Sequence, residues 1–129
     1  MLTVVAAVVE SHGKILVCQR RRGDTFGLMW EFPGGKVQDG EATQEALARE
    51  IQEELGVEAE IGDEMFRMTH RYAEMSEPIE LIFYSARLNA GEIQNLAFET
   101  MEWRDPDSLG ELKFLPADRE FISILQQPR

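Results

Sequence analysis

The stretch GKVQDGEATQEALAREIQEELGV, residues 35–57, decides how this chain folds. A glycine turn leads through an isolated glutamate into a helix that we expect over residues 42–55. Glu50, Glu53 and Glu54 are spaced i, i+3 and i+4, which puts their side chains on one face of that helix. Three carboxylates so close repel one another unless a cation neutralises them. Hard divalent metals prefer oxygen ligands together with substrate phosphates, so the stretch predicts metal-assisted chemistry on a phosphorylated substrate.

The predicted helix has one apolar face, which we expect to pack on the rest of the protein. Its members fall on an arc of about 100° at 3.6 residues per turn; they are Leu47, Ala48, Ile51 and Leu55. Gly56 follows at the position of a C-terminal cap. The three glutamates border this arc, so they should lie beside the protein body, where a site can form. Arg49 is spaced to pair with Glu45 or Glu53 and to hold a carboxylate in place.

A solvated, charged helix face is the alternative explanation of the glutamates. Two features favour a site instead. Glu50 and Glu54 form a like-charged i, i+4 pair, which isolated helices avoid. The turn Pro33-Gly34-Gly35 just upstream would let backbone carbonyls and amides approach a metal or a phosphate closely.

Composition limits the fold and the partners. The 129 residues, 43% of them hydrophobic, suit a single domain spanning residues 1–129. The formal net charge of −11 argues against binding DNA or RNA polymers, which rests on basic patches, although part of this charge can simply aid solubility. No apolar run approaches the roughly 18 residues of a membrane span, so no membrane association is expected. The single cysteine, Cys18, lies in an apolar run, which predicts a buried thiol and a reducing, cytoplasmic location.

Extended segments dominate the rest of the chain. Apolar runs bounded by turn residues predict strands at 3–10, 14–20, 30–32, 36–37, 58–69, 78–88 and 100–104. A turn is expected at 89–91, and a last helix after Pro116 with Phe121, Ile122 and Leu125 facing inward. The pattern predicts a mixed α/β (α+β) domain, a mostly β framework with helices packed on it.

The stretch that begins at Gly35 resembles the signature of a known family. Gly35, five residues, Glu41, seven residues, and then REIQEELGV starting at Arg49 match every fixed position of the Nudix box. The chain is therefore similar to Nudix hydrolases, which cleave nucleoside diphosphates linked to another group. The resemblance implies the Nudix fold, an α/β/α sandwich with a central mixed β-sheet.

The same resemblance implies roles for individual residues. Glu50, Glu53 and Glu54, with the carbonyl of Gly34, match the ligands of Mg²⁺, with Mn²⁺ as an alternative metal. Glu53, Glu50 and Arg49 are the expected catalytic groups, with Arg49 orienting the carboxylates.

Two further carboxylates match positions of the family pattern. Glu41 matches the residue that braces the helix together with the arginine of the box. Relatives also carry a carboxylate before a late strand that assists as base or metal ligand. We assign that role to Glu99 as a catalytic residue, with Glu102 as the alternative.

Resemblance outside the box narrows the family to its MutT-like branch. The segments QRR at 19–21, WEFPGGK at 30–36 and PAD at 116–118 look like those of MutT-type nucleoside triphosphate pyrophosphatases. These enzymes release a nucleoside monophosphate and pyrophosphate, typically from 8-oxo-dGTP, and so sanitise the nucleotide pool. The likeness implies a nucleoside triphosphate as the partner of this chain. It leaves open whether the protein is a monomer or a homodimer.

Five residues are expected to bind that substrate. Arg20 and Arg21 can hold phosphate oxygens through their forked groups, and Lys36 lies in the matching segment. Phe32 can stack on a base, and Asp118 can accept hydrogen bonds from purine N–H groups. Four of them have a plainer alternative: the arginines can be solvated, Phe32 can be core, and Asp118 can cap the last helix.

Two other functions remain open from the sequence. Cytidine and modified-pyrimidine pyrophosphatases, acting on CTP or 5-methyl-dCTP, share the Trp-Glu-Phe and Pro-Ala-Asp patterns, so the motifs do not choose a base. A nucleotide-binding module without catalysis would have the same fold. Such modules usually lose glutamates of the box, and this chain retains all of them.

Overall fold

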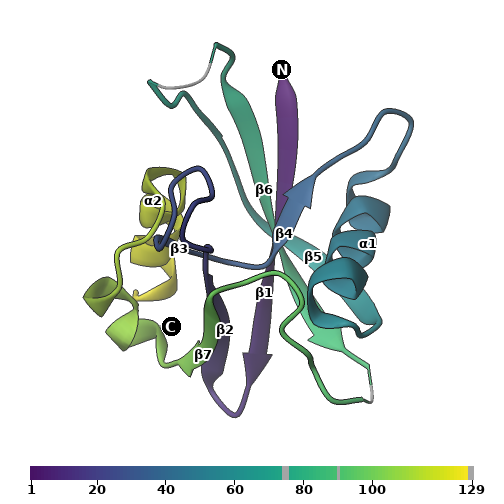
Figure 1. Cartoon of the computed structure of the whole chain (residues 1–129), viewed down its shortest axis with the longest axis vertical. Coiled ribbons are helices and arrows are strands. Elements are labelled where there is room, and N and C mark those ends of the chain that lie inside the picture. Colours follow the sequence, from purple (N-terminus) through teal and green to yellow (C-terminus); the bar gives the residue numbers. More distant parts are fainter. Residues whose placement is uncertain (74–75, 90, 128–129) are drawn as a thin grey trace.

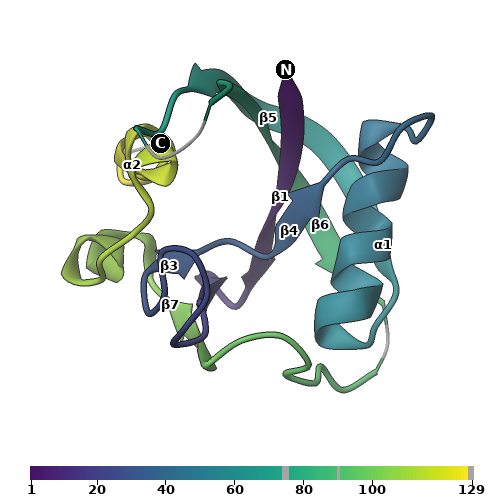
Figure 2. The same ribbon diagram turned by 45° about the horizontal axis from the view of Figure 1, so that its top comes forward.

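The computed structural model describes residues 1–73, 76–89 and 91–127 (Figures 1 and 2). The expected turn at 89–91 includes Ala90, which lies outside the described residues. The elements along the chain are β1 (Leu2–Ser11), β2 (Lys14–Gln19), β3 (Trp30–Glu31), β4 (Gly34–Lys36), α1 (Thr43–Leu55), β5 (Ala59–His70), β6 (Ile79–Leu88), β7 (Thr100–Arg104), the 3₁₀ helix η1 (Pro106–Glu111) and α2 (Pro116–Leu125).

The strands form one mixed sheet in which β1 is central. Its main path runs β3-β2-β1-β6-β5, and β4 and β7 pair with β1 and β2. β1 lies parallel to β6 and antiparallel to β4 and β2. Such a strand is covered on both faces, which explains why its sequence is an almost unbroken apolar run.

Helices cover both faces of the sheet, as the predicted sandwich requires. Alternate side chains of a strand point to opposite faces. Val5, Ala7 and Val9 of β1 pack in a core with α1, whereas Ala6 and Val8 pack in a second core with α2 and η1. Figures 1 and 2 show α1 and α2 on opposite sides of β1. The predicted fold class is therefore confirmed.

Helix α1 follows its prediction within one residue at its start. Its buried residues are Ala46, Leu47, Ile51 and Leu55. Ala46 thus takes the buried place expected for Ala48, which is only partly buried. Each fully buried Leu or Ile contributes about 1.5–3 kcal/mol, so this face anchors the helix to the sheet. Gly56 ends the helix in the left-handed conformation, with φ of 70°.

The glycines after Pro33 do not form the expected turn. Gly34, Gly35 and Lys36 make the short strand β4, which pairs antiparallel with β1. The pairing depends on glycine, because a Cβ at Gly34 would lie 2.0 Å from the carbonyl oxygen of Val5. The strand expected at 36–37 therefore begins at Gly34.

A contact between distant segments places α2 beside β3. The Trp30 amide donates to the Lys113 carbonyl at 2.9 Å, and the Leu115 amide donates to the Trp30 carbonyl at 3.0 Å. The first turn of α2 is thereby fixed next to the WEF segment. Among the described residues, no helix is both long enough and apolar enough to cross a bilayer.

Candidate active site

Arg49 lies at the centre of the acidic face of α1. Its Nε and Nη2 donate to the two oxygens of Glu41 at 2.8 and 3.1 Å. Nη1 donates to Glu50 at 3.0 Å and to Glu53 at 3.3 Å, and Nη2 also reaches the Lys36 carbonyl at 3.1 Å. One guanidinium therefore ties the segment before the helix, two of its glutamates and β4 together.

Two of the pairings considered for Arg49 can now be compared. The i, i+4 pair with Glu53 is formed. The pair with Glu45 is not, because the Glu45 carboxylate accepts from the Ala42 amide at the start of α1. The hydrogen bond from Arg49 holds the pKa of Glu41 below its usual range.

The acidic face of α1 packs directly against β4. The Gly34 amide donates to the Glu54 carboxylate at 3.0 Å. A Cβ at Gly35 would lie 2.5 Å from the carboxyl carbon of Glu50. Gly35 thus makes room for the Glu50 carboxylate, while the Gly34 backbone holds the Glu54 carboxylate by a hydrogen bond. At Gly34 it is the N–H that makes this contact; a metal was expected to bind the carbonyl.

Burial makes these carboxylates hard to ionise without a cation. It raises the pKa of Glu54 to about 9, helped by the charges of Glu50, Glu31 and Glu53 and opposed by the Gly34 hydrogen bond. Burial also raises the pKa of Glu50, although Arg49 opposes it. A nearby divalent cation reverses this balance because it favours the charged form.

The residues present fit a hard divalent metal in their chemistry. Glu50, Glu53 and Glu54 offer carboxylate oxygens on one helix face, and Gly35 of β4 leaves space beside Glu50. In the part of the chain that the structure describes, no three acidic, histidine or cysteine side chains are already grouped as a ligand set. Instead Glu50 and Glu53 bind Arg49 and Glu54 binds Gly34. Metal binding would therefore replace some of these hydrogen bonds.

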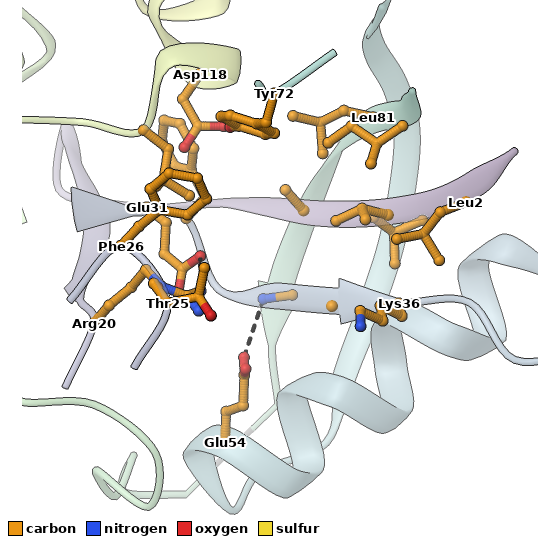
Figure 3. Close-up of a pocket in the computed structure, with 18 residues that line it drawn as sticks. Leu2, Arg20, Thr25, Phe26, Glu31, Lys36, Glu54, Tyr72, Leu81 and Asp118 are labelled. Atoms are coloured by element: carbon orange, nitrogen blue, oxygen red, sulfur yellow. Dashed lines mark hydrogen bonds and ion pairs between the residues drawn. The ribbon is translucent and has the colours of Figure 1, made fainter. Parts of the chain in front are cut away.

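Glu54 also lines a cavity of about 510 Å³ that extends away from the helix. We call Gly34, Gly35, Lys36 and Glu54 the helix end of the pocket. We call Phe26, Glu31, Tyr72 and Asp118 its distal end. Figure 3 shows Glu54 and Asp118 on opposite sides of the pocket. A cavity of this volume is typical of small-molecule sites.

Asp118 is a buried acid at the distal end, with only 4% of its surface exposed. It lies in the first turn of α2 but makes no capping hydrogen bond there. Instead, the Ala117 amide in this first turn donates to the Tyr72 hydroxyl at 3.2 Å. Burial, with the charge of Glu31, raises the pKa of Asp118 well above its usual range. The neutral carboxylic acid, which can both donate and accept, is therefore favoured.

Phe32 lies in the core, as its alternative interpretation held. Its ring is 3% exposed and packs against Phe83, Phe114 and Phe121 at centroid distances of 5.6 to 5.9 Å. These contacts make it a wall of the pocket and argue against a stacking role. The partly buried ring of Phe26 lies at the distal end instead.

The three expected cationic ligands have different positions. Arg20 lines the pocket, but its guanidinium is bound to Glu31 at 3.0 Å. Arg21 is exposed, donates to the Leu96 carbonyl and does not line the pocket. Lys36 lines the helix end and makes no ion pair with any carboxylate that the structure describes.

The loop carboxylates lie away from the pocket. Glu99 is exposed, and its side chain accepts from the Arg22 amide at 3.2 Å. Glu102 lies on β7 and pairs with Arg104 at 3.5 Å. Neither lines the cavity, so the structure does not bring Glu99 together with the glutamates of α1.

Sequence patterns did not identify three residues of the distal end: Phe26, Glu31 and Tyr72. Glu31 belongs to the WEF segment, and an acid that alternates with two buried aromatic residues could have been noticed there. Phe26 comes from the loop of residues 21–29, and Tyr72 follows the end of β5 by two residues. No spacing rule connects them, and only the fold brings their rings together, 5.0 Å apart.

The chain is similar to known proteins over most of its length. The family model described as NUDIX domain matches residues 1–124. The CTP pyrophosphohydrolase of Escherichia coli (strain K12) is 37% identical over 119 residues, which cover 92% of this chain and 86% of that protein. The 8-oxo-dGTP diphosphatase of Haemophilus influenzae is 31% identical over 126 residues, covering 97% and 91%.

A solved structure superposes on this chain over almost its full length. The MutT NUDIX hydrolase from Burkholderia pseudomallei superposes with a TM-score of 0.84 at 28% identity, covering 95% of each chain. The likeness of fold therefore extends over nearly the whole chain and is not confined to α1.

Proposed function

Since this chain belongs to the NUDIX family of hydrolases, we propose that it cleaves nucleoside triphosphates in the cytoplasm to a nucleoside monophosphate and pyrophosphate, with Mg²⁺ as the metal. One observation carries the proposal. A single cavity runs from Glu54 and Lys36 at the helix end to the buried acid Asp118 at the distal end. A phosphate chain suits the first end and a base suits the second.

Side chains of the protein orient the catalytic carboxylates and can bind the charged phosphates. Arg49 fixes Glu41 and Glu50, while the Glu53 side chain is 57% exposed and can accept a proton from the attacking water. Lys36 can bind phosphate oxygens. Water forms a new bond to phosphorus as the bond to the bridging oxygen breaks, which leaves pyrophosphate. A bound divalent metal would neutralise the phosphate oxygens.

The distal end favours a base with a donor and an acceptor side by side. A neutral Asp118 offers both functions. 8-Oxoguanine presents an N7–H donor next to its O6 acceptor, whereas guanine presents two acceptors on that edge. 8-Oxo-dGTP is therefore the first candidate substrate, which implies a role in sanitising the nucleotide pool.

Cytidine triphosphates are the second candidate. The relative from Escherichia coli named CTP pyrophosphohydrolase is 37% identical, more than the 8-oxo-dGTP diphosphatase from Haemophilus influenzae at 31%. Cytosine also offers an acceptor beside an amino donor, so Asp118 suits it as well.

A panel of substrates tests both proposals. The protein is assayed with Mg²⁺ against 8-oxo-dGTP, dGTP, CTP, dCTP, 5-methyl-dCTP and ADP-ribose, and kcat/KM is compared. We expect 8-oxo-dGTP to exceed dGTP because of its N7–H donor. A preference for the cytidine nucleotides would support the second candidate, and turnover of ADP-ribose alone would refute both.

A further inference from the structure

Arg20 lies between β2 and the loop of residues 21–29, which forms one wall of the pocket. Its Nη1 donates to both oxygens of Glu31, at 3.0 and 3.2 Å, and its Nε donates to the Thr25 carbonyl at 2.7 Å. Figure 3 shows Arg20, Thr25, Phe26 and Glu31 on the same side of the pocket. One guanidinium fork therefore joins the loop to an acid of the distal end.

The same residue closes the loop through its backbone. The Arg20 amide donates to the Met29 carbonyl, and the Leu28 amide donates to the Arg20 carbonyl, both at 2.9 Å. Within the loop, Phe26 and Leu28 have left-handed φ values of 58° and 67°. Residues other than glycine adopt this conformation at an energetic cost, so surrounding contacts must hold it. The Phe26 ring, held in this way, packs on Tyr72.

We propose that Arg20 is a positioning residue that sets base preference by holding Phe26 and Glu31 at the distal end, and that it is not a ligand of the triphosphate. The inference rests on the proposed function. The charge of Arg20 is offset by Glu31. The two residues form an ion pair whose side chains are 27% and 20% exposed. Lys36 is the other cation of the pocket, and its ammonium group makes no ion pair with a described carboxylate.

Two substitutions separate positioning from phosphate binding. Lysine serves as a phosphate ligand but cannot donate to Glu31 and to the Thr25 carbonyl with the fixed fork of arginine. We expect both Arg20→Met and Arg20→Lys to change the ratio of kcat/KM between 8-oxo-dGTP and CTP by at least about fivefold, with the larger part of the change in KM. The inhibition constant of inorganic tripolyphosphate with Mg²⁺ should stay within about twofold in both variants.

A double-mutant cycle tests whether Arg20 acts through its partner. If it does, the double variant Arg20→Met with Glu31→Gln should change the ratio of kcat/KM between 8-oxo-dGTP and CTP no more than the single variant with the larger effect does. Arg22→Met is the matched control, because it removes the same charge from an exposed side chain that does not line the pocket. The control should leave base preference and tripolyphosphate inhibition unchanged.

Amide hydrogen exchange of residues 21–29 reads the positioning directly and needs no substrate. Exchange at Gly27 and Leu28 should accelerate in Arg20→Met and Arg20→Lys but not in Arg22→Met. The inference is overturned if tripolyphosphate inhibition weakens about tenfold or more in Arg20→Met and is restored by Arg20→Lys. It is also overturned if the exchange of the loop does not change. By contrast, wild-type protein that turns over no triphosphate would refute the proposed function, while the exchange experiment would still decide the positioning role.

Discussion

Glu53 differs from the other glutamates of α1 in its exposure. Its side chain is 57% exposed and forms ion pairs only with Arg49 among the described residues, whereas the Glu50 side chain is 16% exposed. An exposed carboxylate can exchange an arginine contact for a metal or a water molecule without disturbing the fold. At the scale of single residues, Glu53 is therefore the clearest candidate for the proton-accepting group.

We predict that Glu53→Gln lowers kcat by at least about 10², the size of a typical acid–base or metal contribution. The melting temperature should be unchanged, because the side chain is mostly exposed. Steady-state kinetics with Mg²⁺ and the best substrate of the panel measure the effect. Glu58→Gln is a matched control, since Glu58 is exposed and its side chain makes no ion pair with any residue that the structure describes. Wild-type turnover in Glu53→Gln on every substrate would refute the catalytic assignment.

Asp118 provides a prediction about protonation. If the neutral acid binds the base, Asp118→Asn keeps a donor and an acceptor and should raise KM only slightly. Asp118→Ala should raise KM about tenfold with kcat nearly unchanged, as expected for uniform binding. Because burial raises the pKa of Asp118, wild-type KM should increase as rising pH ionises the acid, and KM of Asp118→Asn should not. Equal KM for Asp118→Asn and Asp118→Ala would show that the neutral acid is not what binds.

At the scale of elements, β4 and α1 form the unit that carries the glutamates. A methyl group at Gly34 would meet the backbone of Val5 at 2.0 Å, and one at Gly35 would meet the end of the Glu50 side chain at 2.5 Å. A backbone clash cannot be relieved without moving a strand, whereas a side chain can rotate away. The two glycines therefore support different properties of the protein.

We predict opposite effects for alanine at these two positions. Gly34→Ala should lower the free energy of unfolding by about 2–4 kcal/mol, because it strains β4 against β1. Gly35→Ala should remain folded but lose activity, since it displaces the Glu50 carboxylate from Arg49. Urea denaturation and kcat measured on both variants test this contrast. Full activity in Gly35→Ala would show that the position of Glu50 does not matter.

Local patterns account for the elements that could be predicted. The apolar spacing and Gly56 define α1 to within one residue at its start, and β7 begins and ends as expected. Pairings between distant segments follow no such pattern. The strand character of Gly34 depends on β1, and η1 has no apolar period of its own.

The candidate site divides along the same line. Arg49 and its glutamates lie within one helical stretch and the segment just before it, so spacing could relate them. Glu31 and Asp118 are brought together because β3 pairs with residues 113–115, just before α2, a contact that no single segment encodes. The burial of Asp118, which raises its pKa, therefore could not be predicted from the sequence either.

At the scale of the whole molecule, the buried carboxylates link stability to pH. The folded pKa of Glu54 is about 9, whereas an unfolded glutamate has a pKa of about 4.3. Between these values the folded state binds more protons than the unfolded state, so the free energy of unfolding decreases as pH rises. Burial shifts Glu31, Glu50 and Asp118 in the same direction. The shifts of Glu41 and Glu64 are opposite, but the stability they contribute is complete above the unfolded pKa of about 4.3, so it stays constant between pH 6 and pH 9.

The metal-free protein should therefore melt at a lower temperature at pH 9 than at pH 6. Mg²⁺ should raise the melting temperature more at pH 9, because binding needs ionised carboxylates and displaces fewer protons there than at pH 6. At pH 7 binding should release protons, which calorimetry in two buffers of different ionisation enthalpy can count. Glu54→Gln should weaken both the pH dependence and the proton release. A stabilisation by Mg²⁺ that is the same at pH 6 and pH 9, with no proton released at pH 7, would mean that the metal does not bind the Glu54 carboxylate of α1.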